Sequence, residues 1–520
     1  MSDIPTRDYV TLYVNGRPLK VRGDGAFLPL SEFLRRRQGL TGTKVVCAEG
    51  DCGSCAVMIG RVRDGGLVYN SVASCIQIVA QLDGVHVVTV EGLKRGGQLN
   101  VIQESLVQCQ GTQCGFCTPG FVVSMYDAMR PGQSDGQTPV DAHVLRRALV
   151  GNLCRCTGYD SIVKAGLAVD PQELPSPDEL YPPEPIVASL SKAATSSVLL
   201  TDDESERRLF KPTSVEEACG FFADNEGSSV LAGGTDLGVL ENKRIQRYVT
   251  VVSLADLPEL RGVDVTDKAI LIGAGESLTT LERLCQTYLP SFADVLAYFG
   301  SPLIKNAGTV AGNLVTASPI SDTAPTYYAT NATLELVGPA GRRSVTVEDF
   351  HTGYRKTQLQ AGEIVASLRI PLPKQAQVFK AYKVSRRVDL DIASFGAAFL
   401  LTLDGDTITG ARIAYGGVAA TTLRMRKTED ALVGQPLSLA TMQAAAEVAM
   451  GEVTPMTDVR GSEAYRRQLA GNILLKLYHD LKPAGGGGSN GRHVPPAPPT
   501  NGQHTTGDTP LRPVLAEEVA

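Results

Sequence analysis

The stretch Cys47-Ala-Glu-Gly-Asp-Cys52-Gly-Ser-Cys55 decides how the N-terminal part of the chain folds. Its cysteines have the spacing C-x4-C-x2-C, and Cys75 follows after nineteen intervening residues. This is the plant-type spacing of a [2Fe–2S] cluster. The two glycines of the stretch lack a Cβ, so the loop can turn tightly and aim backbone N–H groups at negatively charged sulfurs. Structural zinc or reduced core thiols are the alternatives, but zinc sites usually pair two short C-x2-4-C knuckles and only one occurs here.

A second set of four cysteines follows, in a region whose apolar residues recur at helical spacing over 101–109, 119–129 and 141–152. Cys114 and Cys117 form one pair, and Cys154 and Cys156 form another after thirty-six intervening residues. Two such pairs on neighbouring helices could converge on one metal centre. By spacing alone, a tetrahedral zinc ion competes here with an iron–sulfur cluster. Cys109 has no role in the pattern and is interpreted as a buried bystander.

Length and composition limit the class of protein. At 520 residues the chain is long enough for three or four domains, and 43 % hydrophobic with 20 % charged residues is ordinary for a globular protein. A net charge of −6 leaves no basic footprint, so we expect no nucleic-acid partner. No stretch reaches the ~18 apolar residues of a membrane helix, and the N-terminus has no secretory apolar core. We therefore expect a cytoplasmic protein without membrane contact. The chain has 11 cysteines, and in that compartment cysteines are expected as ligands or catalytic groups rather than as disulfides.

Local patterns predict the order of elements. Alternating apolar residues around Asn15-Gly16 predict a β-hairpin over residues 9–21. Further strands are expected at 55–59 and 86–90, with a short helix at 30–37. Residues 169–205 are rich in Pro, Ser and acidic side chains, which predicts an extended interdomain linker. The tail from residue 484 is low in complexity and is expected to be disordered.

Two glycine-rich segments follow the linker, Val230-Leu-Ala-Gly-Gly-Thr-Asp-Leu-Gly238 and Asn306-Ala-Gly-Thr-Val-Ala-Gly-Asn-Leu314. Glycine lets the backbone approach a pyrophosphate and donate N–H groups to it. Either segment alone is equally well interpreted as a plain turn. A third segment, Gly273-Ala-Gly275, begins like a dinucleotide fingerprint but lacks its third small residue, so a Rossmann site is not expected there.

Longer strings around the second cysteine set carry a family resemblance. Gln113-Cys-Gly-Phe-Cys-Thr-Pro-Gly120 and Gly151-Asn-Leu-Cys-Arg-Cys-Thr-Gly-Tyr159, behind a plant-type ferredoxin motif, resemble the iron–sulfur domains of molybdenum hydroxylases. The resemblance implies a helical bundle that holds another [2Fe–2S] cluster. It implies that Gln113 lies close to the molybdenum cofactor of a partner. The implied metal ligands are Cys47, Cys52, Cys55 and Cys75 for one cluster, and Cys114, Cys117, Cys154 and Cys156 for the other.

The two glycine-rich segments together, in this order, look like the FAD domain shared by xanthine dehydrogenase and its relatives. The resemblance implies that the first segment wraps the pyrophosphate through Leu231, Ala232, Gly233, Gly234, Thr235 and Asp236, although some relatives have Glu where Asp236 stands. Further implied FAD contacts are Thr309, Gly312, Asn313, Asp322, Phe299 beside the flavin ring, Val365 and Lys383. The charged run Arg386–Ala393 fits a loop that governs access of NAD or oxygen, and a solvated turn is the alternative interpretation.

The order of parts resembles the small subunits of bacterial xanthine dehydrogenases. The expected fold class is α+β and multidomain: a β-grasp ferredoxin-like domain, an all-α [2Fe–2S] bundle, a two-part PCMH-like FAD-binding domain and an α+β C-terminal flavoprotein domain. The expected boundaries are 1–92 for the ferredoxin-like domain, 93–168 for the helical domain, 169–205 for the linker, 206–373 for the FAD-binding domain, 374–483 for the CO-dehydrogenase-flavoprotein-like domain and 484–520 for the tail.

The resemblance implies electron transfer rather than substrate chemistry on this chain. Electrons from hypoxanthine or xanthine, oxidised in purine catabolism at the molybdenum cofactor of a molybdopterin-binding large subunit, would pass through the helical-domain cluster, the ferredoxin-like cluster and FAD to NAD+. A heterotetramer or larger assembly is expected, and no residue here is expected to act as a catalytic acid, base or nucleophile. The alternatives are the equivalent part of an aldehyde or N-heterocycle hydroxylase and, from another class, a zinc-stabilised scaffold without redox activity.

Overall fold

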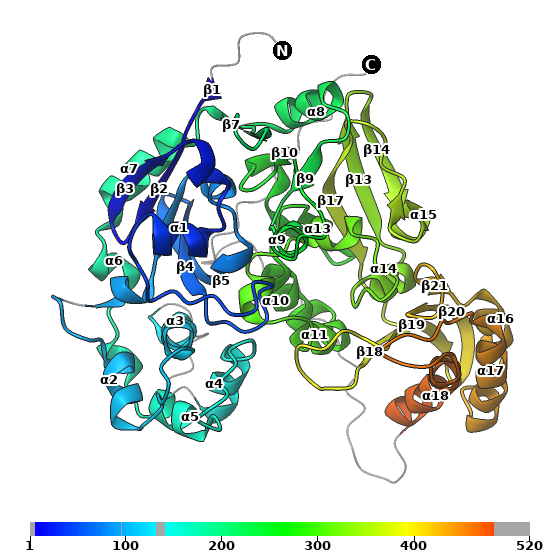
Figure 1. Ribbon diagram of the computed structural model, residues 1–520. Coiled ribbons are helices and arrows are strands. Elements are labelled where there is room, and N and C mark those ends of the chain that lie inside the picture. The colour runs from blue at the N-terminus through cyan, green and yellow to red at the C-terminus, as the bar shows by residue number, and fades with distance from the viewer. Residues whose placement is uncertain (1–5, 95, 132–140, 483–520) are drawn as a thin grey trace. The chain divides into compact units, whose positions relative to one another are not determined.

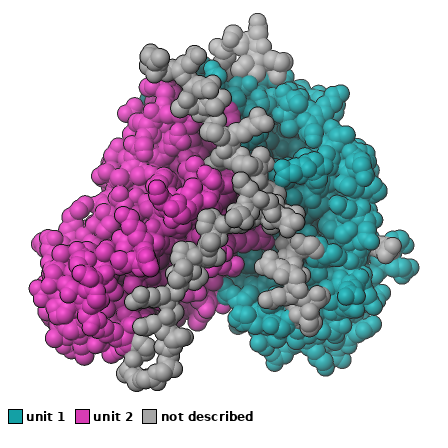
Figure 2. Space-filling view, turned by 180° about the vertical axis from the view of Figure 1, so that it is seen from behind, with its two compact units in different colours: residues 1–258, 301–308 teal, residues 259–300, 309–520 magenta. Residues whose placement is uncertain are grey.

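The computed structural model describes residues 6–94, 96–131 and 141–482, and the tail expected from residue 484 lies outside them. The chain forms two compact units (Figure 2). Unit 1 comprises Met1–Pro258 and Ser301–Gly308, and unit 2 comprises Glu259–Gly300 and Thr309–Ala520. None of the described helices combines the length and apolar character needed to cross a membrane.

Unit 1 begins with a mixed five-stranded sheet in the order β3-β2-β6-β4-β5 (Figure 1). Its strands are β2 (Val10–Val14), β3 (Arg17–Val21), β4 (Ala56–Arg63), β5 (Gly66–Ala73) and β6 (Val85–Val88), and α1 (Leu30–Arg36) lies between β3 and β4 in the chain. The predicted hairpin is confirmed: β2 pairs antiparallel with β3, and Asn15 and Gly16 have φ of 48° and 78°. Alternate residues of β2 and β4, such as Leu12 and Val57, are buried in the same apolar core.

Four helices follow in unit 1: α2 (Val101–Gln108), α3 (Thr118–Met129), α4 (Ala142–Ala148) and α5 (Asp160–Leu167). They confirm the helical region that the apolar spacing predicted. Helix α3 packs against β4 and β5, where it buries Phe121, Val122 and Met125. Pro119 lies in its first turn, where the missing N–H has no intrahelical partner to lose.

Residues 169–205 are not the extended segment that their composition suggested. They contain α6 (Pro177–Leu180), α7 (Pro183–Ala193) and strand β7 (Ser197–Asp202). Pro183 begins α7, since a proline at the first helical position costs no hydrogen bond. Ile186 and Leu190 of α7 are buried against Tyr13 of β2. The proline cluster therefore marks helix starts on the surface of the first sheet.

A second sheet completes unit 1, in the order β1-β7-β8-β10-β9. Its remaining strands are β1 (Thr6–Arg7), β8 (Arg207–Lys211), β9 (Ser229–Leu231) and β10 (Thr250–Ser253), and the helices of this part are α8 (Val215–Asp224), α9 (Leu237–Asn242) and α12 (Pro302–Lys305). Strand β9 runs parallel to β10 at the edge of the sheet and leads directly toward α9. The first glycine-rich segment is the connection between them.

Unit 2 contains a five-stranded antiparallel sheet in the order β11-β12-β17-β13-β14. Its strands are β11 (Val263–Val265), β12 (Ala269–Gly273), β13 (Thr333–Gly338), β14 (Gly341–Thr346) and β17 (Ile364–Pro371). The accompanying elements are α10 (Leu278–Tyr288), α11 (Pro290–Ala297), α13 (Val310–Val315), α14 (Ala324–Thr330), α15 (Val347–Phe350), β15 (His351–Gly353) and β16 (Lys356–Thr357). The second glycine-rich segment leads into α13, which contacts β17.

The C-terminal part of unit 2 is a four-stranded antiparallel sheet with helices against it. Its elements are β18 (Gln377–Val384), β19 (Phe395–Asp404), β20 (Thr407–Gly416), β21 (Leu423–Arg424), α16 (Arg426–Leu432), α17 (Leu439–Glu452) and α18 (Glu463–Leu481). Phe399 and Tyr415 of the sheet pack in one core with Leu474 of α18. The fold class predicted from the sequence, a multidomain α+β protein, is confirmed.

Arg466 of α18 is a buried cation that ties this part together. It is 1 % exposed and donates hydrogen bonds to the carbonyl oxygens of Ser394 and Met456 and to the carboxylate of Asp458. Replacing it by methionine removes the donor to the carbonyl oxygens of Ser394 and Met456, and an unsatisfied buried polar group costs about 1–3 kcal/mol. We expect Arg466→Met to lower the free energy of unfolding by that amount, measured by denaturant unfolding.

Lys476→Met is the matched control. Lys476 lies on the same helix, is half exposed, pairs with Asp480 one turn away and lies over the ring of Tyr382. Such surface pairs contribute about 0.5 kcal/mol or less. Equal stability of the two variants would contradict the role given to Arg466.

Candidate redox cofactor sites

The first four-cysteine group lies on the loop between α1 and β4, with Cys75 in the short helix η2 (Ser74–Ile76). Cys52, Cys55 and Cys75 are buried, and Cys47 is half-buried. Side-chain hydrogen bonds from Cys52 and Cys75 hold the pKa of the Cys47 thiol far below its usual range, and Cys55 bonds to Cys75. Four thiols in mutual contact, mostly shielded from water, are the donor set that a [2Fe–2S] cluster requires.

The second group lies at the start of α3 and on the loop between α4 and α5. The sulfur of Cys156 is 3.8 Å from that of Cys154 and 3.7 Å from that of Cys114, and Cys117 shares a hydrogen bond with Cys154. In contrast to the first group, two of its members, Cys114 and Cys156, are exposed. The structure therefore brings together each set of four cysteines that the sequence grouped, one inside unit 1 and one at its surface.

The surroundings of the second group shift the pKa values of the half-buried Cys117 and the buried Cys154 in opposite directions. Burial raises the pKa of the Cys117 thiol to about 12, and neighbouring thiols add to this effect. Burial would also raise the pKa of Cys154, but a side-chain hydrogen bond from Thr157 and backbone N–H groups lower it to about 7. These hydrogen bonds favour the thiolate form of Cys154, which is the form in which a cysteine ligates a metal.

A single zinc ion would need ligand side chains that converge on one point. Within the described ranges, no three His, Cys, Asp or Glu side chains converge in the way that a single metal ion requires. A cluster with two irons needs no such point, because its four thiolates are shared between two metals. The arrangement of both groups is compatible with that larger cofactor.

The loop that carries Cys52 touches both segments of the second cysteine group through its backbone, and these segments are called the two cysteine loops below. The N–H of Leu153 donates to the carbonyl of Cys52 at 3.0 Å. Gly53 has φ of 67°, and a Cβ there would lie 2.5 Å from the carbonyl oxygen of Gly151. A Cβ on Gly120 of α3 would lie 2.2 Å from the carbonyl oxygen of Gly53. Only glycine permits this approach at both positions. One hydrogen bond therefore links Cys52 of the first group to Leu153, the residue before Cys154 of the second.

Asn152 lies at this contact and is a buried polar group without a protein partner. Its side chain is 4 % exposed, and neither Oδ1 nor Nδ2 forms a hydrogen bond with the protein. The Nδ2 atom lies against Gly53, within 2.6 Å of the position of an added Cβ. Buried amides are almost always paired in native structures. An acceptor beside the two cysteine loops, such as a cluster sulfur, would satisfy this donor.

The segment around Cys75, which belongs to the first cysteine group, also touches the first glycine-rich segment within unit 1. Gln77, two residues after Cys75, donates from Nε2 to the carbonyl of Gly233 at 2.9 Å. A Cβ on Gly234 would lie 3.0 Å from the carbonyl oxygen of Ile76. A Cβ on Gly233 would lie 1.9 Å from the carbonyl oxygen of Ala307, so this position too accepts only glycine. The segment predicted to wrap a pyrophosphate is thus packed directly behind the first cysteine group.

The other predicted FAD contacts belong to unit 2. Asp322 and Lys383 form an ion pair at 2.9 Å, with both side chains 6 % exposed. Burial raises the pKa of Asp322, which Lys383 partly offsets, and the Oδ1 atom of Asp322 has no partner. Lys383 also donates to the carbonyl of Tyr298, the residue before the predicted ring contact Phe299. A buried pair with one free carboxylate oxygen is able to accept a hydrogen bond from a bound cofactor.

The remaining predicted contacts of unit 2 lie around α13. Thr309 caps this helix, because its hydroxyl accepts from the N–H of Gly312 at 3.1 Å. Asn313 accepts from the hydroxyl of Thr323, next to Asp322 in the chain, at 2.6 Å. Val365 is buried on β17, the strand that α13 contacts. Unit 2 therefore collects its predicted contacts on neighbouring elements.

The charged run after β18 forms a local turn. Asp391 accepts the backbone N–H groups of Arg386 and Arg387 at 3.0 and 2.9 Å and pairs with the guanidinium of Arg387. The hydrogen bonds from Arg387 lower the pKa of Asp391, although burial acts in the opposite direction. This geometry fits the solvated-turn interpretation, and a role in acceptor access stays a prediction.

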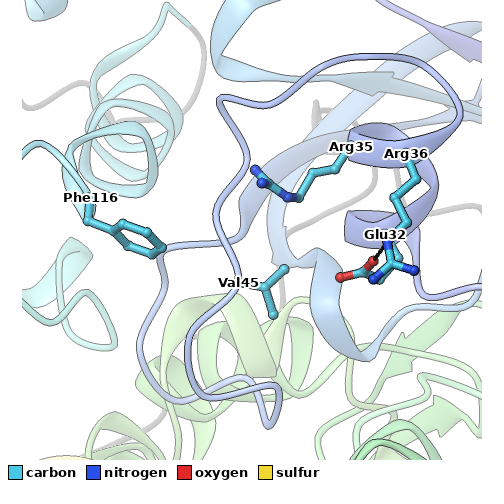
Figure 3. A pocket seen from close by; sticks show the side chains of 5 residues that line it. All are labelled: Glu32, Arg35, Arg36, Val45 and Phe116. Atoms are coloured by element: carbon cyan, nitrogen blue, oxygen red, sulfur yellow. Dashed lines mark ion pairs between the residues drawn. The ribbon is translucent and has the colours of Figure 1, made fainter.

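An open depression of about 320 Å³ lies beside the two cysteine loops (Figure 3). It is lined by Glu32, Arg35, Arg36, Val45 and Phe116, and no cysteine contributes to it. Arg36 pairs with Glu32, and Phe116 comes from the second cysteine loop and faces Val45 (Figure 3). The depression therefore lies near the cysteines, but none of the predicted cofactor contacts lines it.

Sequence reasoning missed three polar residues of these sites. Asn152 stands inside a quoted string, but no spacing rule marks it. Asn242 and Lys243 of α9 contact the first cysteine loop across more than 160 positions of sequence. No local pattern signals such a contact.

Three protein-family descriptions match the chain. They are a [2Fe-2S] binding domain at residues 89–167, the FAD binding domain in molybdopterin dehydrogenase at 204–373, and the CO dehydrogenase flavoprotein C-terminal domain at 380–481. These descriptions agree with the cysteine and glycine patterns in identity and in order.

Curated relatives are similar over nearly all of the chain. Xanthine dehydrogenase of Emericella nidulans is 30 % identical over 91 % of this chain and 39 % of its own length. Xanthine dehydrogenase/oxidase of Gallus gallus is 28 % identical over 92 % of this chain and 40 % of its own length. The chain thus spans about two fifths of the length of these relatives.

Among solved structures, a chain of carbon monoxide dehydrogenase from Hydrogenophaga pseudoflava is similar, with a TM-score of 0.50 and 29 % identity. The similarity covers 52 % of this chain and 94 % of that one. The chain therefore carries a [2Fe–2S] binding domain, a molybdopterin-dehydrogenase FAD domain and a CO-dehydrogenase-type flavoprotein domain, and 91 % of it aligns with part of a xanthine dehydrogenase. These findings assign the chain to the molybdenum hydroxylase family, as its FAD- and [2Fe–2S]-binding part.

Proposed function

We propose that this chain carries electrons from a molybdenum-cofactor protein that oxidises hypoxanthine or xanthine to FAD and then to NAD+, through two [2Fe–2S] clusters. Iron–sulfur clusters move single electrons, and FAD collects two and delivers them to NAD+ as a hydride. The chain's own task is to hold the cofactors close together and to set the surroundings of each. Its cysteines act as ligands in the reducing cytoplasm, where disulfides are rare.

One observation carries this proposal: the two segments that hold the first cysteine group each touch one of the other sites of unit 1. Cys52 accepts a hydrogen bond from Leu153 of the second cysteine loop. Gln77, beside Cys75, donates to Gly233 of the predicted pyrophosphate segment. Because electron transfer through protein weakens steeply with distance, this order of contacts favours the path from the second group to the first group and on to FAD.

The exposure of the second group supports its position at the donor end. Cys114 and Cys156 are exposed, and so are the neighbouring apolar side chains of Phe116, Leu153 and Tyr159. Exposed apolar residues that gather beside a functional site are typical of a surface that docks a partner. We propose that this surface, with Gln113, faces a molybdopterin-binding large subunit in a heterotetramer or larger assembly.

We propose the following ligand roles. Cys47, Cys52, Cys55 and Cys75 hold the first cluster, and Cys114, Cys117, Cys154 and Cys156 hold the second. Leu231, Ala232, Gly233, Gly234, Thr235 and Asp236 bind the FAD pyrophosphate, and Thr309, Gly312, Asn313, Asp322, Phe299, Val365 and Lys383 make further FAD contacts. We keep the domain boundaries proposed from the sequence, with residues 169–205 as a connection that carries helices and a strand.

A second candidate keeps the same electron path with another substrate. The chain resembles carbon monoxide dehydrogenase as well as xanthine dehydrogenases, and the substrate would bind to the partner. The substrate that reduces the purified complex distinguishes the two candidates.

Metal and flavin analysis tests the proposed cofactors. We expect about four irons and one FAD per chain, with little zinc, because each [2Fe–2S] cluster takes four cysteine ligands. A zinc-loaded, colourless protein would instead support the non-redox scaffold and eliminate both candidates above.

Cys117→Ser tests the order of the path. We expect it to remove the electron paramagnetic resonance (EPR) signal of one cluster and to stop electrons from the partner from reaching FAD, while NADH still reduces FAD. Cys109→Ser is the matched control, since Cys109 lies near Ser105 and outside the ligand set. Loss of NADH-driven dye reduction in folded, FAD-loaded Cys117→Ser would contradict the order.

Gly120→Ala tests the contact between the two cysteine loops. The added methyl group would collide with the carbonyl of Gly53, and such overpacking costs about 1–3 kcal/mol. We expect the loops to separate, which weakens the magnetic interaction between the two reduced clusters in EPR spectra. Gly220→Ala, on α8 with open space around its Cα, is the control and should leave the spectra unchanged.

A further inference from the structure

Two side chains at the end of α9 hold the first cysteine loop from the side of the flavin segment. Asn242 donates from Nδ2 to the carbonyl oxygens of Ala48 and Cys75, at 3.0 and 2.7 Å. Lys243 donates from Nζ to the carbonyl of Cys47 at 3.0 Å. The three carbonyls belong to the proposed ligands Cys47 and Cys75 and to Ala48, the residue after Cys47, so the end of α9 holds the backbone around the metal site.

The contact joins two segments of the site that are far apart in the sequence. Ala48 has φ of 55°, a left-handed conformation that costs a residue with a Cβ some stability. Both N–H groups of the Asn242 amide are used, one on each segment of the site, which fixes Cys75 relative to the loop. A shorter or apolar side chain cannot bridge the two carbonyls.

Lys243 also controls charge beside the first group. Its ammonium lies 2.9 Å from the carboxylate of Glu49, two residues after Cys47, and this pairing raises the pKa of Lys243. A reduced [2Fe–2S] cluster carries one more negative charge than the oxidised form. Removing Lys243 leaves Glu49 without its counter-charge beside that site, which opposes reduction. The pair is more than a third exposed, so the effect is screened by salt.

The same helix is continuous with the predicted pyrophosphate segment. Gly238 donates its N–H to the carbonyl of Gly234 at 2.9 Å, and Leu240 donates to Asp236 at 3.1 Å. Residues 233–243 therefore contact the first cysteine group at both ends: Gly233 accepts from Gln77, two residues after Cys75, and Lys243 donates to Cys47. The segment that approaches the flavin and the loop that approaches the iron are therefore one packed assembly.

We propose that Asn242 and Lys243 are positioning residues for the first cluster: they hold its loop against the flavin segment and raise its reduction potential above the value it would otherwise have. This inference rests on the proposed function, because it needs a cluster at Cys47, Cys52, Cys55 and Cys75. It adds to that function two residues at the end of α9 that would set the position and the reduction potential of the first cluster.

The experiment is a redox titration of the intact complex, followed by EPR. The signal that Cys117→Ser retains identifies the first cluster, and the other cluster serves as an internal reference. For Lys243→Met we expect the ratio of reduced to oxidised first cluster at a fixed potential to fall by about threefold to tenfold, where tenfold is about 59 mV for one electron. The shift should shrink at high salt, and Lys243→Arg should restore the original ratio.

Asn242→Leu tests positioning separately from charge. We expect it to change the g-values or line width of the first-cluster signal and to leave those of the second unchanged. Lys164→Met, which removes an exposed lysine of α5 in the same unit, is the matched control and should leave both clusters unaltered.

The outcomes separate the two levels of the account. A wild-type protein without a first-cluster signal would overturn the proposed function itself. A wild-type protein with both signals, in which Lys243→Met and Asn242→Leu leave the first cluster's potential and spectrum unaltered, would overturn only this inference. An equal shift of both clusters would overturn it too, because it would indicate a change throughout the unit.

Discussion

Two neighbours pack closely against the backbone of the first cysteine group: the second cysteine group and the predicted pyrophosphate segment with α9. The proposed electron path depends on this packing. On one side, Gly53 meets Gly151 and Gly120 with no room for a side chain. On the other side, the carbonyl of Cys75 meets Asn242, and Gln77 meets Gly233. A loop that wraps iron cannot also present bulky side chains to both neighbours. Glycine at the contacts and backbone hydrogen bonds between the loops are the physical solution.

The two cysteine groups differ in their surroundings in a way that suits a relay. The first group is mostly buried and is contacted by elements of the flavin half of unit 1. The second has two exposed cysteines and exposed apolar neighbours such as Phe116. Solvent access and hydrogen bonds to sulfur are the main means by which a protein tunes an iron–sulfur potential. Two clusters of the same composition would therefore have different potentials here, which gives the transfer a direction.

Local chemistry explains what could be predicted from the sequence. Asn15-Gly16 adopts the left-handed turn that a tight hairpin requires, and the apolar spacing of α3 places Phe121 and Met125 in the core. The cysteines could be grouped correctly because the spacing within each pair limits which thiols can meet. Residues 169–205 were misjudged because proline clusters occur both in linkers and at helix starts, and only the packing of Ile186 and Leu190 of α7 distinguishes the two.

What could not be predicted are contacts between distant segments. The bond from Asn242 to Cys75 joins residues 167 positions apart, and the bond from Leu153 to Cys52 joins two domains. Burial also raises the pKa of the Cys117 thiol to about 12. These features depend on tertiary packing, which a single sequence does not reveal.

Spin counting on the fully reduced, cofactor-loaded protein tests the central claim most directly. The account predicts two distinct S = 1/2 signals that integrate to about two spins per chain and broaden each other, because two [2Fe–2S] clusters lie on touching loops. One signal, or no paramagnetic iron at all after complete reduction, would contradict it.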